Sequence, residues 1–188
     1  MKTHRIAVIA GDGIGKEVVP AGIEILNLAA EQGAFTCEFT QIPWGCDYYL
    51  QTGRMLDPDG VDQLLRFDAI YLGAIGDPRV ADHISARELI LPLRQKLGQW
   101  VNLRPMRLMP GISSPLANRG AAEIDMICVR ENSEGEYCGM GGRLHGGTPY
   151  ELAEQTGVFT RNGIERIARY AFKLAESRPR KMLASATK

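Results

Sequence analysis

The sequence predicts an α/β fold built on a mixed, largely parallel sheet. Short apolar stretches rich in β-branched residues alternate with longer amphipathic stretches, and glycine-containing turns separate the two kinds. Strands and helices that alternate in this way typically form parallel βαβ units. The 188 residues, of which 45% are hydrophobic, are enough for one large domain or two small lobes.

The first βαβ unit begins at the N-terminus. Residues 5–10 (RIAVIA) are predicted to form a buried strand that ends at the glycine turn GDGIG. A helix is predicted over 16–32, because its apolar residues recur at i, i+4, i+7 and i+11 and Gly33 is a natural stop. Those residues are Val19, Ile23, Leu26 and Ala30. Alternating side chains then predict a second strand over 35–42.

The middle of the chain continues the alternation. We expect a helix at 58–66, a strand at 68–72, a helix over 84–97 that is broken or bent at Pro92, and a buried strand at 124–129.

The last third begins with a glycine-rich segment. Residues 135–147 contain six glycines, which exclude a regular helix and indicate a loop or extended arm. A stripe of apolar residues predicts a helix over 160–176, and a strand is expected to start at 182–187. Because the sequence stops at Lys188, directly after that predicted strand, we expect the chain to be part of a longer protein.

Composition narrows the function classes. Lys plus Arg and Asp plus Glu number 22 each, so no charge imbalance indicates a nucleic acid or an anionic membrane as partner. The N-terminal apolar run, residues 6–11, is too short for a signal peptide or a membrane span, and we expect a cytoplasmic protein. The four cysteines and three histidines show no zinc or triad spacing.

The turn GDGIG is the first candidate site. It lies between a predicted strand and a predicted helix, where backbone N–H groups and the helix dipole meet anions. Its spacing matches neither dinucleotide fingerprint GxGxxG, because position 16 is Lys16, nor a P-loop. A ligand-binding loop and a simple tight turn therefore both remain open.

Three arginines form the second candidate site. Arg94 lies on a predicted helix, Arg104 just beyond it, and Arg130 at the end of the strand 124–129. A guanidinium group holds a carboxylate through two parallel charge-assisted hydrogen bonds, so three of them suit a substrate with two carboxylates. Taken singly, an arginine is more often a partner in a surface salt bridge.

Two further side chains are candidates for proton transfer. Tyr137 follows the polar segment RENSEGE and is a proton donor if a nearby cation lowers its pKa from about 10. The alternative is a buried tyrosine whose hydroxyl is hydrogen-bonded. Lys188 is a general base only if burial or positive neighbours lower its pKa from about 10.4.

Four segments together resemble the β-decarboxylating dehydrogenases, the family of isopropylmalate, isocitrate, tartrate and D-malate dehydrogenases. They are GDGIGKEV, LPLRQKLGQWVNLRP, VRENSEGEYCGMGGR and the final ATK. The resemblance runs from residue 5 to 188, and FDAIYLGAIGDP, ADHIS and RYAFKLAESRPRK look most like the tartrate and D-malate branch.

The resemblance implies an isopropylmalate dehydrogenase-like fold with two lobes and a protruding dimer arm. Residues 1–101 would form the first part of the large lobe, and 102–188 the first part of the second, dimer-forming lobe, with the arm at about 138–158. The C-terminal remainder of the family fold is absent from this sequence.

The resemblance also implies roles for the candidate residues. Arg94, Arg104 and Arg130 match the substrate-carboxylate arginines, Tyr137 the catalytic tyrosine, and Lys188 the catalytic lysine that family members lend across a homodimer interface. The turn would lie near the nicotinamide end of NAD. Its cofactor-binding residues would be Gly11, Asp12, Gly13 and Ile14.

The implied reaction is the NAD-dependent oxidative decarboxylation of D-malate or tartrate, assisted by Mg²⁺ or Mn²⁺. The family's metal-binding aspartates lie beyond the position of Lys188, so we expect no metal ligand in this chain and no turnover by the 188 residues alone. Isopropylmalate or isocitrate oxidation, or a non-catalytic subunit or fragment of the same fold, are the alternatives.

Arg87 and Glu88 lie where family members choose the third substituent of the substrate. Isopropylmalate enzymes carry a glutamate at the place of Arg87, and isocitrate enzymes use a serine nearby. This pair fits neither pattern, and an additional cation favours a polar group at C3, as in tartrate, over isopropyl.

Overall fold

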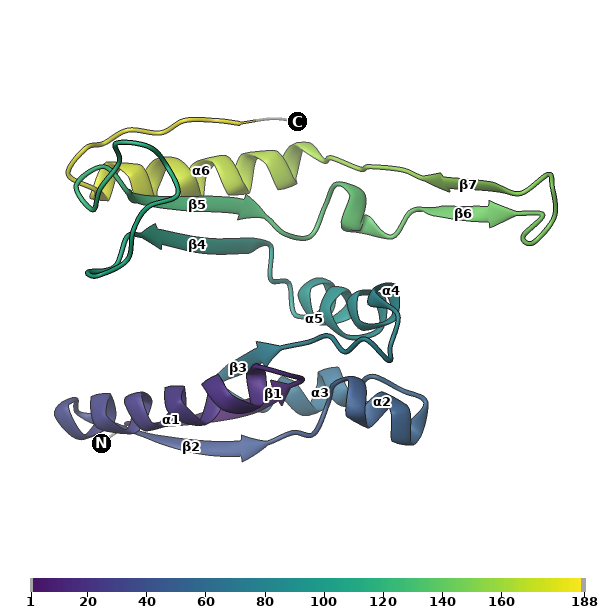
Figure 1. Cartoon of the computed structure of the whole chain (residues 1–188), viewed down its shortest axis with the longest axis horizontal. Helices are drawn as coiled ribbons and strands as arrows, with labels where there is room; N and C mark the ends of the chain where they lie inside the picture. Colours follow the sequence, from purple (N-terminus) through teal and green to yellow (C-terminus); the bar gives the residue numbers. More distant parts are fainter. Residues whose placement is uncertain (1, 187–188) are drawn as a thin grey trace. The chain divides into compact units, whose positions relative to one another are not determined.

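The computed structural model describes residues 2–186 and divides the chain into two compact units, Met1–Leu97 (unit 1) and Gly98–Lys188 (unit 2). Figure 1 shows their elements in chain order. Unit 1 is a parallel sheet covered by helices, and unit 2 combines antiparallel strand pairs with one long helix. The predicted α/β fold class is confirmed.

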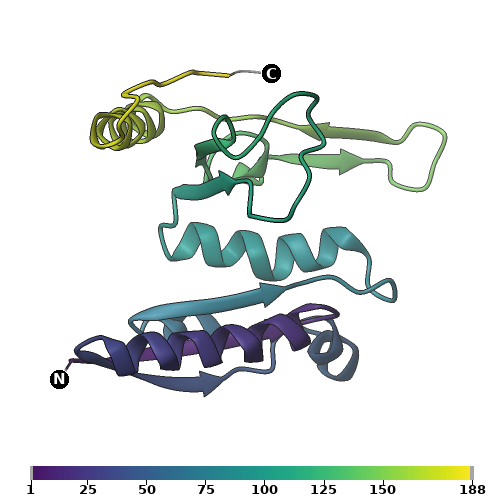
Figure 2. The ribbon, with the colours of Figure 1, turned by 60° about the vertical axis from the view of Figure 1, so that its left-hand side comes forward.

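Unit 1 is built on three parallel strands in the order β2-β1-β3. The strands are β1 (Lys2–Gly11), β2 (Phe35–Gln41) and β3 (Ala69–Ala74). Helix α1 (Gly15–Gln32) connects β1 to β2 and lies beside the sheet (Figure 2). The predicted strand, helix and strand of this βαβ unit are therefore confirmed. They were predictable because each has a strong local pattern of apolar side chains.

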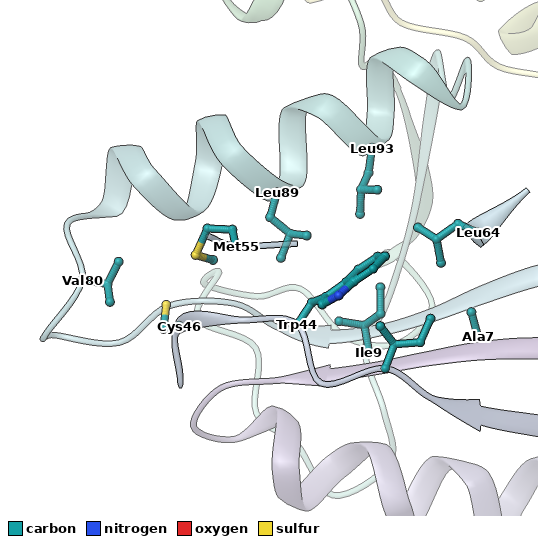
Figure 3. Close-up of a cluster of buried hydrophobic side chains, with 10 residues drawn as sticks. Ala7, Ile9, Trp44, Cys46, Met55, Leu64, Val80, Leu89 and Leu93 are labelled. Carbon is teal, nitrogen blue, oxygen red and sulfur yellow. The ribbon is translucent and has the colours of Figure 1, made fainter. Parts of the chain in front are cut away.

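Alternate side chains of β1 belong to two separate hydrophobic clusters. Ile6 and Val8 pack with Val19 of α1 on one face of the sheet. Ala7 and Ile9 point to the opposite face and belong to a larger cluster around Trp44, which is 1% exposed (Figure 3). Burial on both faces explains why β1 reads as a continuous apolar run rather than as an alternating one.

A helical segment covers the larger cluster. It consists of α4 (Asp82–Ser85), a π-helical turn η1 (Ala86–Ile90) and α5 (Leu91–Lys96). Leu89 and Leu93 lie on the side of this segment that faces Trp44 (Figure 3). The sequence predicted a break or bend at Pro92, and the structure has a π turn directly before it.

Two shorter helices complete unit 1. Helix α2 (Cys46–Thr52) was not predicted, and it ends at Gly53, whose φ is +74°. Helix α3 (Gly60–Leu64) is shorter than the predicted 58–66 and places Leu64 in the larger cluster.

Unit 2 contains an antiparallel pair, β4 (Val101–Arg107) and β5 (Asp125–Glu131). Helix α6 (Arg161–Ser177) packs against β5 and agrees with the predicted helix over 160–176. Strand β4 was not predicted as a strand. The segment that contains NLRP becomes a strand by pairing with β5, which lies some twenty residues later in the chain.

The glycine-rich segment forms a hairpin. A short 3₁₀ turn, η2 (Glu136–Cys138), leads into β6 (Gly141–Leu144), which pairs antiparallel with β7 (Leu152–Gln155). Within unit 2 the hairpin extends beyond β4, β5 and α6 (Figure 1). It occupies the stretch for which an arm was expected, and its role between subunits stays a prediction.

The predicted strand over 182–187 is wrong for the residues that the structure describes. Residues 182–186 are exposed and form no strand. Their β-like composition is not sufficient, because a strand is stable only when its backbone pairs with a neighbour, and no described strand pairs with this segment.

Within residues 2–186, no helix combines the length and the apolar character that crossing a membrane requires.

Candidate functional site

The glycine turn between β1 and α1 is tightly packed against β3. The amide of Asp12 donates to the Ala74 carbonyl at 2.6 Å, and Gly11 has a φ of +72°. A Cβ atom on Gly11 would lie 2.1 Å from the Ala74 oxygen, and one on Gly15 would lie 2.1 Å from the Ala10 oxygen. Glycine is therefore required at both positions for the backbones to approach each other, whether or not a ligand binds.

The Asp12 side chain points into the protein and is 3% exposed. Its carboxylate oxygens accept from the Cys46 amide at 2.9 and 3.0 Å and from the Gly76 amide at 3.1 Å. These amides belong to the loops that follow β2 and β3, so Asp12 joins the ends of three parallel strands. Gly13 and Ile14 of the turn are exposed, Ile14 to 59%.

A cavity of about 500 Å³ lies beside the turn, within unit 1. It opens at the carboxyl ends of β1 and β2, the edge of a parallel sheet at which ligands bind. Its lining combines the turn, the loop after β2 and the beginnings of α1 and α2. The residues are Ala10, Gly11, Asp12, Lys16, Gln41, Ile42, Pro43, Trp44, Gly45, Asp47 and Tyr48.

A network of exposed ion pairs lies at the same edge of the sheet. Lys16 contacts Asp47 at 2.5 Å, and Arg79 contacts Asp47 and Asp77 at 2.7 Å each. Hydrogen bonds from the side chain and the amide of Arg79 lower the pKa of Asp77 to about 2. The network joins α1, α2 and the loop after β3, which are the segments that Asp12 joins from inside.

The expected specificity residues lie on the helical segment of unit 1. Arg87 and Glu88 are exposed and belong to the π turn η1. Arg94 follows on α5 and is half-buried. All three therefore belong to one helical segment, although its backbone is not regular between them.

The β4–β5 ladder brings Arg104 and Arg130 to one face. Asn102 pairs with Arg130, and Arg104 pairs with Cys128 in the antiparallel register. Paired residues point to the same side, as do residues two apart on one strand, so the two arginines are diagonal neighbours. Diagonal neighbours lie within reach of long side chains, so both guanidinium groups can hold one anionic ligand.

Tyr137 joins this pair. The Arg130 guanidinium lies 5.1 Å from the centre of the Tyr137 ring, in a cation–π contact. The tyrosine is 40% exposed, so it is not the buried structural tyrosine of the alternative interpretation. Unit 2 therefore holds Arg104, Arg130 and Tyr137 as one cluster.

The other expected residues stand apart from this cluster. Arg94 belongs to unit 1, and the meeting of all three arginines stays a prediction. Lys188 lies outside the described residues 2–186, and its catalytic role also stays a prediction.

The charged residues around Tyr137 have structural tasks that the sequence did not reveal. Glu131 accepts from the amides of Ser133 and Glu134 at 2.9 and 2.7 Å and from Arg166 at 3.1 Å. Burial alone would raise the pKa of Glu131, but the hydrogen bonds from the Ser133 hydroxyl, from these amides and from Arg166 outweigh burial and hold the pKa below its usual range. Arg166 in turn lies 5.3 Å from the Trp100 ring.

Glu134 and Asn132 order the same loop. Glu134 accepts from the amide and the hydroxyl of Thr160, the N-cap of α6, at 2.8 and 2.6 Å. The buried Asn132 donates to the Gln99 carbonyl at 3.1 Å. These contacts fix the loop that carries Tyr137. In the sequence, only the threonine at the start of α6 could have indicated this role of Glu134. The two residues are 26 positions apart, so the sequence does not show that they pair.

A divalent metal does not fit the residues that the structure describes. Among residues 2–186, no three or more His, Cys, Asp or Glu side chains are grouped so that they could hold a metal ion.

Comparison with known proteins relates the chain to dehydrogenases. The family model described as isocitrate/isopropylmalate dehydrogenase matches residues 5–188. The D-malate dehydrogenase [decarboxylating] of Escherichia coli (strain K12) is 55% identical over 190 residues, which cover 100% of this chain and 53% of that protein. The tartrate dehydrogenase/decarboxylase of Pseudomonas putida is 50% identical over 188 residues, which cover 99% of this chain and 52% of that protein.

A solved structure supports the same relationship. The crystal structure of isocitrate dehydrogenase from Methylococcus capsulatus matches with a TM-score of 0.72 and 28% identity, over 92% of this chain and 48% of that one. The chain thus spans about half the length of the relatives that it matches. The resemblance inferred from the motifs is confirmed, and the chain belongs to the isocitrate/isopropylmalate dehydrogenase family.

Proposed function

We propose that the protein carrying this sequence catalyses the NAD-dependent oxidative decarboxylation of a small 2-hydroxy dicarboxylic acid, D-malate or tartrate. The observation that carries the proposal is the 55% identity to a decarboxylating D-malate dehydrogenase over the whole chain. The clustering of Arg104, Arg130 and Tyr137 on one side of unit 2 supports it, because two guanidinium groups next to a phenol suit a dicarboxylate and a proton transfer.

The residues of this chain would bind and orient the substrate. Arg104 and Arg130 hold carboxylate oxygens, and Arg94 supplies a third guanidinium group. Lys188 takes the proton of the substrate hydroxyl while the carbon that bears this hydroxyl is oxidised. After CO₂ has left, Tyr137 returns a proton to the carbon that carried it. The products are an oxo acid, which is pyruvate when the substrate is D-malate, and CO₂.

We assign NAD to the exposed part of the glycine turn. A Cβ atom on Gly13 would have no neighbour within 4 Å, and Ile14 presents an exposed apolar surface directly before α1. When bound, NAD supplies the acceptor for the substrate hydride. The chain's part is to hold the turn rigid through Asp12 and the Asp47 ion pairs.

Mg²⁺ or Mn²⁺ remains an expected requirement of the complete enzyme. Because residues 2–186 offer no group of metal ligands, we assign no step of the reaction to a metal held by this chain.

A homodimer is the proposed assembly. The β6–β7 hairpin carries exposed apolar side chains, Leu144 at 61% and Leu152 at 52%, and α6 exposes Phe172 at 66%. A partner subunit that covered these side chains would remove their apolar surface from water, which is favourable. Sedimentation equilibrium tests the proposal, and a strictly monomeric protein would argue against it.

The reaction is tested by following NADH absorbance with NAD, Mn²⁺ and a panel of 2-hydroxy acids. We expect reduction with D-malate or tartrate, accompanied by CO₂ release. Reduction with isopropylmalate or isocitrate alone would move the protein to a sibling activity, and reduction with none of the acids would favour a non-catalytic subunit.

A further inference from the structure

Tyr137 lies on a loop that the sheet of unit 2 does not hold. Strand β5 ends at Glu131, and Tyr137 follows in the 3₁₀ turn η2. Arg130, by contrast, belongs to the β4–β5 ladder, where it pairs with Asn102. The backbone of a strand residue is fixed by its ladder, whereas the backbone of a loop depends on the side-chain contacts around it. The placement of Tyr137 therefore depends on the groups that anchor residues 131–136.

Arg166 of helix α6 anchors the first part of this loop. Its Nη2 atom donates to the Ser133 hydroxyl at 2.7 Å and to the Glu131 carboxylate at 3.1 Å, and it lies 3.9 Å from the Glu134 carboxylate. The side chain of Arg166 is 29% exposed, and those of Glu131 and Glu134 are 21% and 17% exposed. Ion pairs that are mostly shielded from water interact more strongly than pairs on the surface. Arg166 therefore holds the beginning of the loop against α6.

An aromatic ring orients the guanidinium group of Arg166. The group lies 5.3 Å from the centre of the Trp100 ring. Tyr170 meets this ring edge-on, with the two ring centres 6.0 Å apart, and the Trp100 carbonyl accepts from the Asn132 amide at 3.0 Å. A planar guanidinium can stack on a ring and donate from its edge at the same time, and a lysine ammonium cannot. The position therefore uses properties that are specific to arginine.

The same side of α6 packs closely against the loop. A Cβ atom on Gly163 would collide with the Glu134 carboxylate. Gly163 and Arg166 are three residues apart and so lie on one side of the helix. The loop then leads into η2, which begins at Glu136. A shift of residues 131–134 would therefore be passed on to Tyr137 over a very short stretch of chain.

We propose that Arg166 is a positioning residue for Tyr137. Through Glu131 and Ser133 it holds the loop in the geometry in which the Tyr137 hydroxyl gives its proton to the carbon that has lost CO₂. The proposal rests on the proposed function, in which Tyr137 returns that proton, and it adds a residue from outside the cluster of Arg104, Arg130 and Tyr137. All residues that it involves belong to unit 2.

Replacing Arg166 by lysine tests these contacts while the positive charge is retained. A lysine can keep an ion pair with Glu131, but it cannot also stack on Trp100 and reach the Ser133 hydroxyl. Ser133→Ala is a second and milder variant. It removes only one hydroxyl, which accepts from Arg166 and donates to Glu131.

Arg161→Lys is the matched control. Arg161 belongs to the same helix and forms an ion pair with Glu165, but its side chain is 92% exposed. An exposed pair of this kind contributes little, and lysine can replace arginine in it. The control therefore makes the same chemical change on α6 without touching the loop contacts of Arg166.

The measurement is steady-state turnover of D-malate and tartrate by the polypeptide as its gene encodes it, with NAD and Mn²⁺. We expect kcat to fall between about tenfold and about a hundredfold in Arg166→Lys, and less in Ser133→Ala. KM should change less than about twofold, because a misplaced proton donor slows the reaction without loosening the contacts that bind the substrate. Arg161→Lys should leave both constants unchanged.

Two readouts separate positioning from a merely structural role. Hydride leaves the substrate before Tyr137 acts, so in Arg166→Lys the first turnover of NADH should form at the wild-type rate and with full amplitude, and only later turnovers should be slow. In a Tyr137→Phe background, Arg166→Lys should cause no further loss of kcat, because the hydroxyl through which it acts is already absent.

Three results would each overturn the inference: an unchanged kcat in Arg166→Lys, a first turnover slowed as much as the later ones, or a full additional loss in the Tyr137→Phe background. If Arg166→Lys does not fold, Ser133→Ala decides by the same criteria. A wild-type protein that oxidises neither acid refutes the proposed function itself. An active wild type whose turnover is insensitive to both substitutions refutes only the inference.

Discussion

Replacing Asp12 by alanine should destabilise unit 1, although Asp12 lies in a glycine turn that resembles a ligand site. Its carboxylate accepts two hydrogen bonds from the Cys46 amide and one from the Gly76 amide. Cys46 is buried, and an unsatisfied buried amide costs about 1–3 kcal/mol. Gly76 is exposed, so water can replace part of its bond, which contributes about 1 kcal/mol. The expected loss is about 2–4 kcal/mol.

The assay is equilibrium denaturation in guanidinium chloride, followed by the fluorescence of the buried Trp44 with Trp100 replaced by phenylalanine. The free energy of unfolding of Asp12→Asn should lie between those of wild type and Asp12→Ala. Asparagine keeps one acceptor oxygen, but its amide group directs a donor towards a backbone N–H. Asp59→Ala is the control, since among the contacts described the Asp59 carboxylate accepts only an exposed hydrogen bond from the Gln63 side chain. A loss below about 1 kcal/mol in Asp12→Ala, or an equal loss in the control, would refute the reasoning.

Three further outcomes are expected. The pKa of Asp77 is about 2 in the folded protein, below the ordinary 3.8, because Arg79 donates to it. Its contribution to stability is therefore present above pH 3.8 and lost as the pH falls towards 2. Urea midpoints measured against pH should therefore fall less over this range in Asp77→Asn than in wild type. Thr160→Ala removes the N-cap hydrogen bond of α6 and should cost about 1 kcal/mol of unfolding free energy in the same kind of titration, with no loss speaking against the cap. Burial, together with a hydrogen bond to Asp12, raises the pKa of the Cys46 thiol to about 12, so a disulfide reagent at about pH 8 should modify the exposed Cys128 first and Cys46 only on unfolding. Rapid labelling of Cys46 in the native protein would contradict the burial.

Local patterns predicted the parts of the fold that local interactions determine. The helix α1 and the strands β1 and β2 follow from periodicity and from the glycine turn, and α6 follows from its apolar stripe. Strand β4 was missed because its pairing with β5 is non-local. The strand expected over 182–187 was wrong for residues 182–186 because a strand also requires a partner.

The candidate site was predictable as residue types and not as geometry. The sequence indicated Arg104, Arg130 and Tyr137, but the antiparallel register alone places the two arginines on the same face. The resemblance implied that Asp12 binds the cofactor, and this role stays a prediction. The structure adds that its carboxylate is buried and accepts hydrogen bonds from the Cys46 and Gly76 amides. The bend expected at Pro92 is a π turn, because a buried row of residues spaced four apart does not suit a regular helix.

We propose that Arg130, with Arg104 and Tyr137, belongs to a site for a 2-hydroxy dicarboxylic acid. Its most direct test is kcat/KM for D-malate and tartrate in Arg130→Ala and in the exposed control Arg161→Ala. Losing a bidentate contact to a carboxylate costs about 3 kcal/mol or more, so we expect kcat/KM to fall about a hundredfold or more in Arg130→Ala and to change little in the control. Equal activity in the two variants would contradict it.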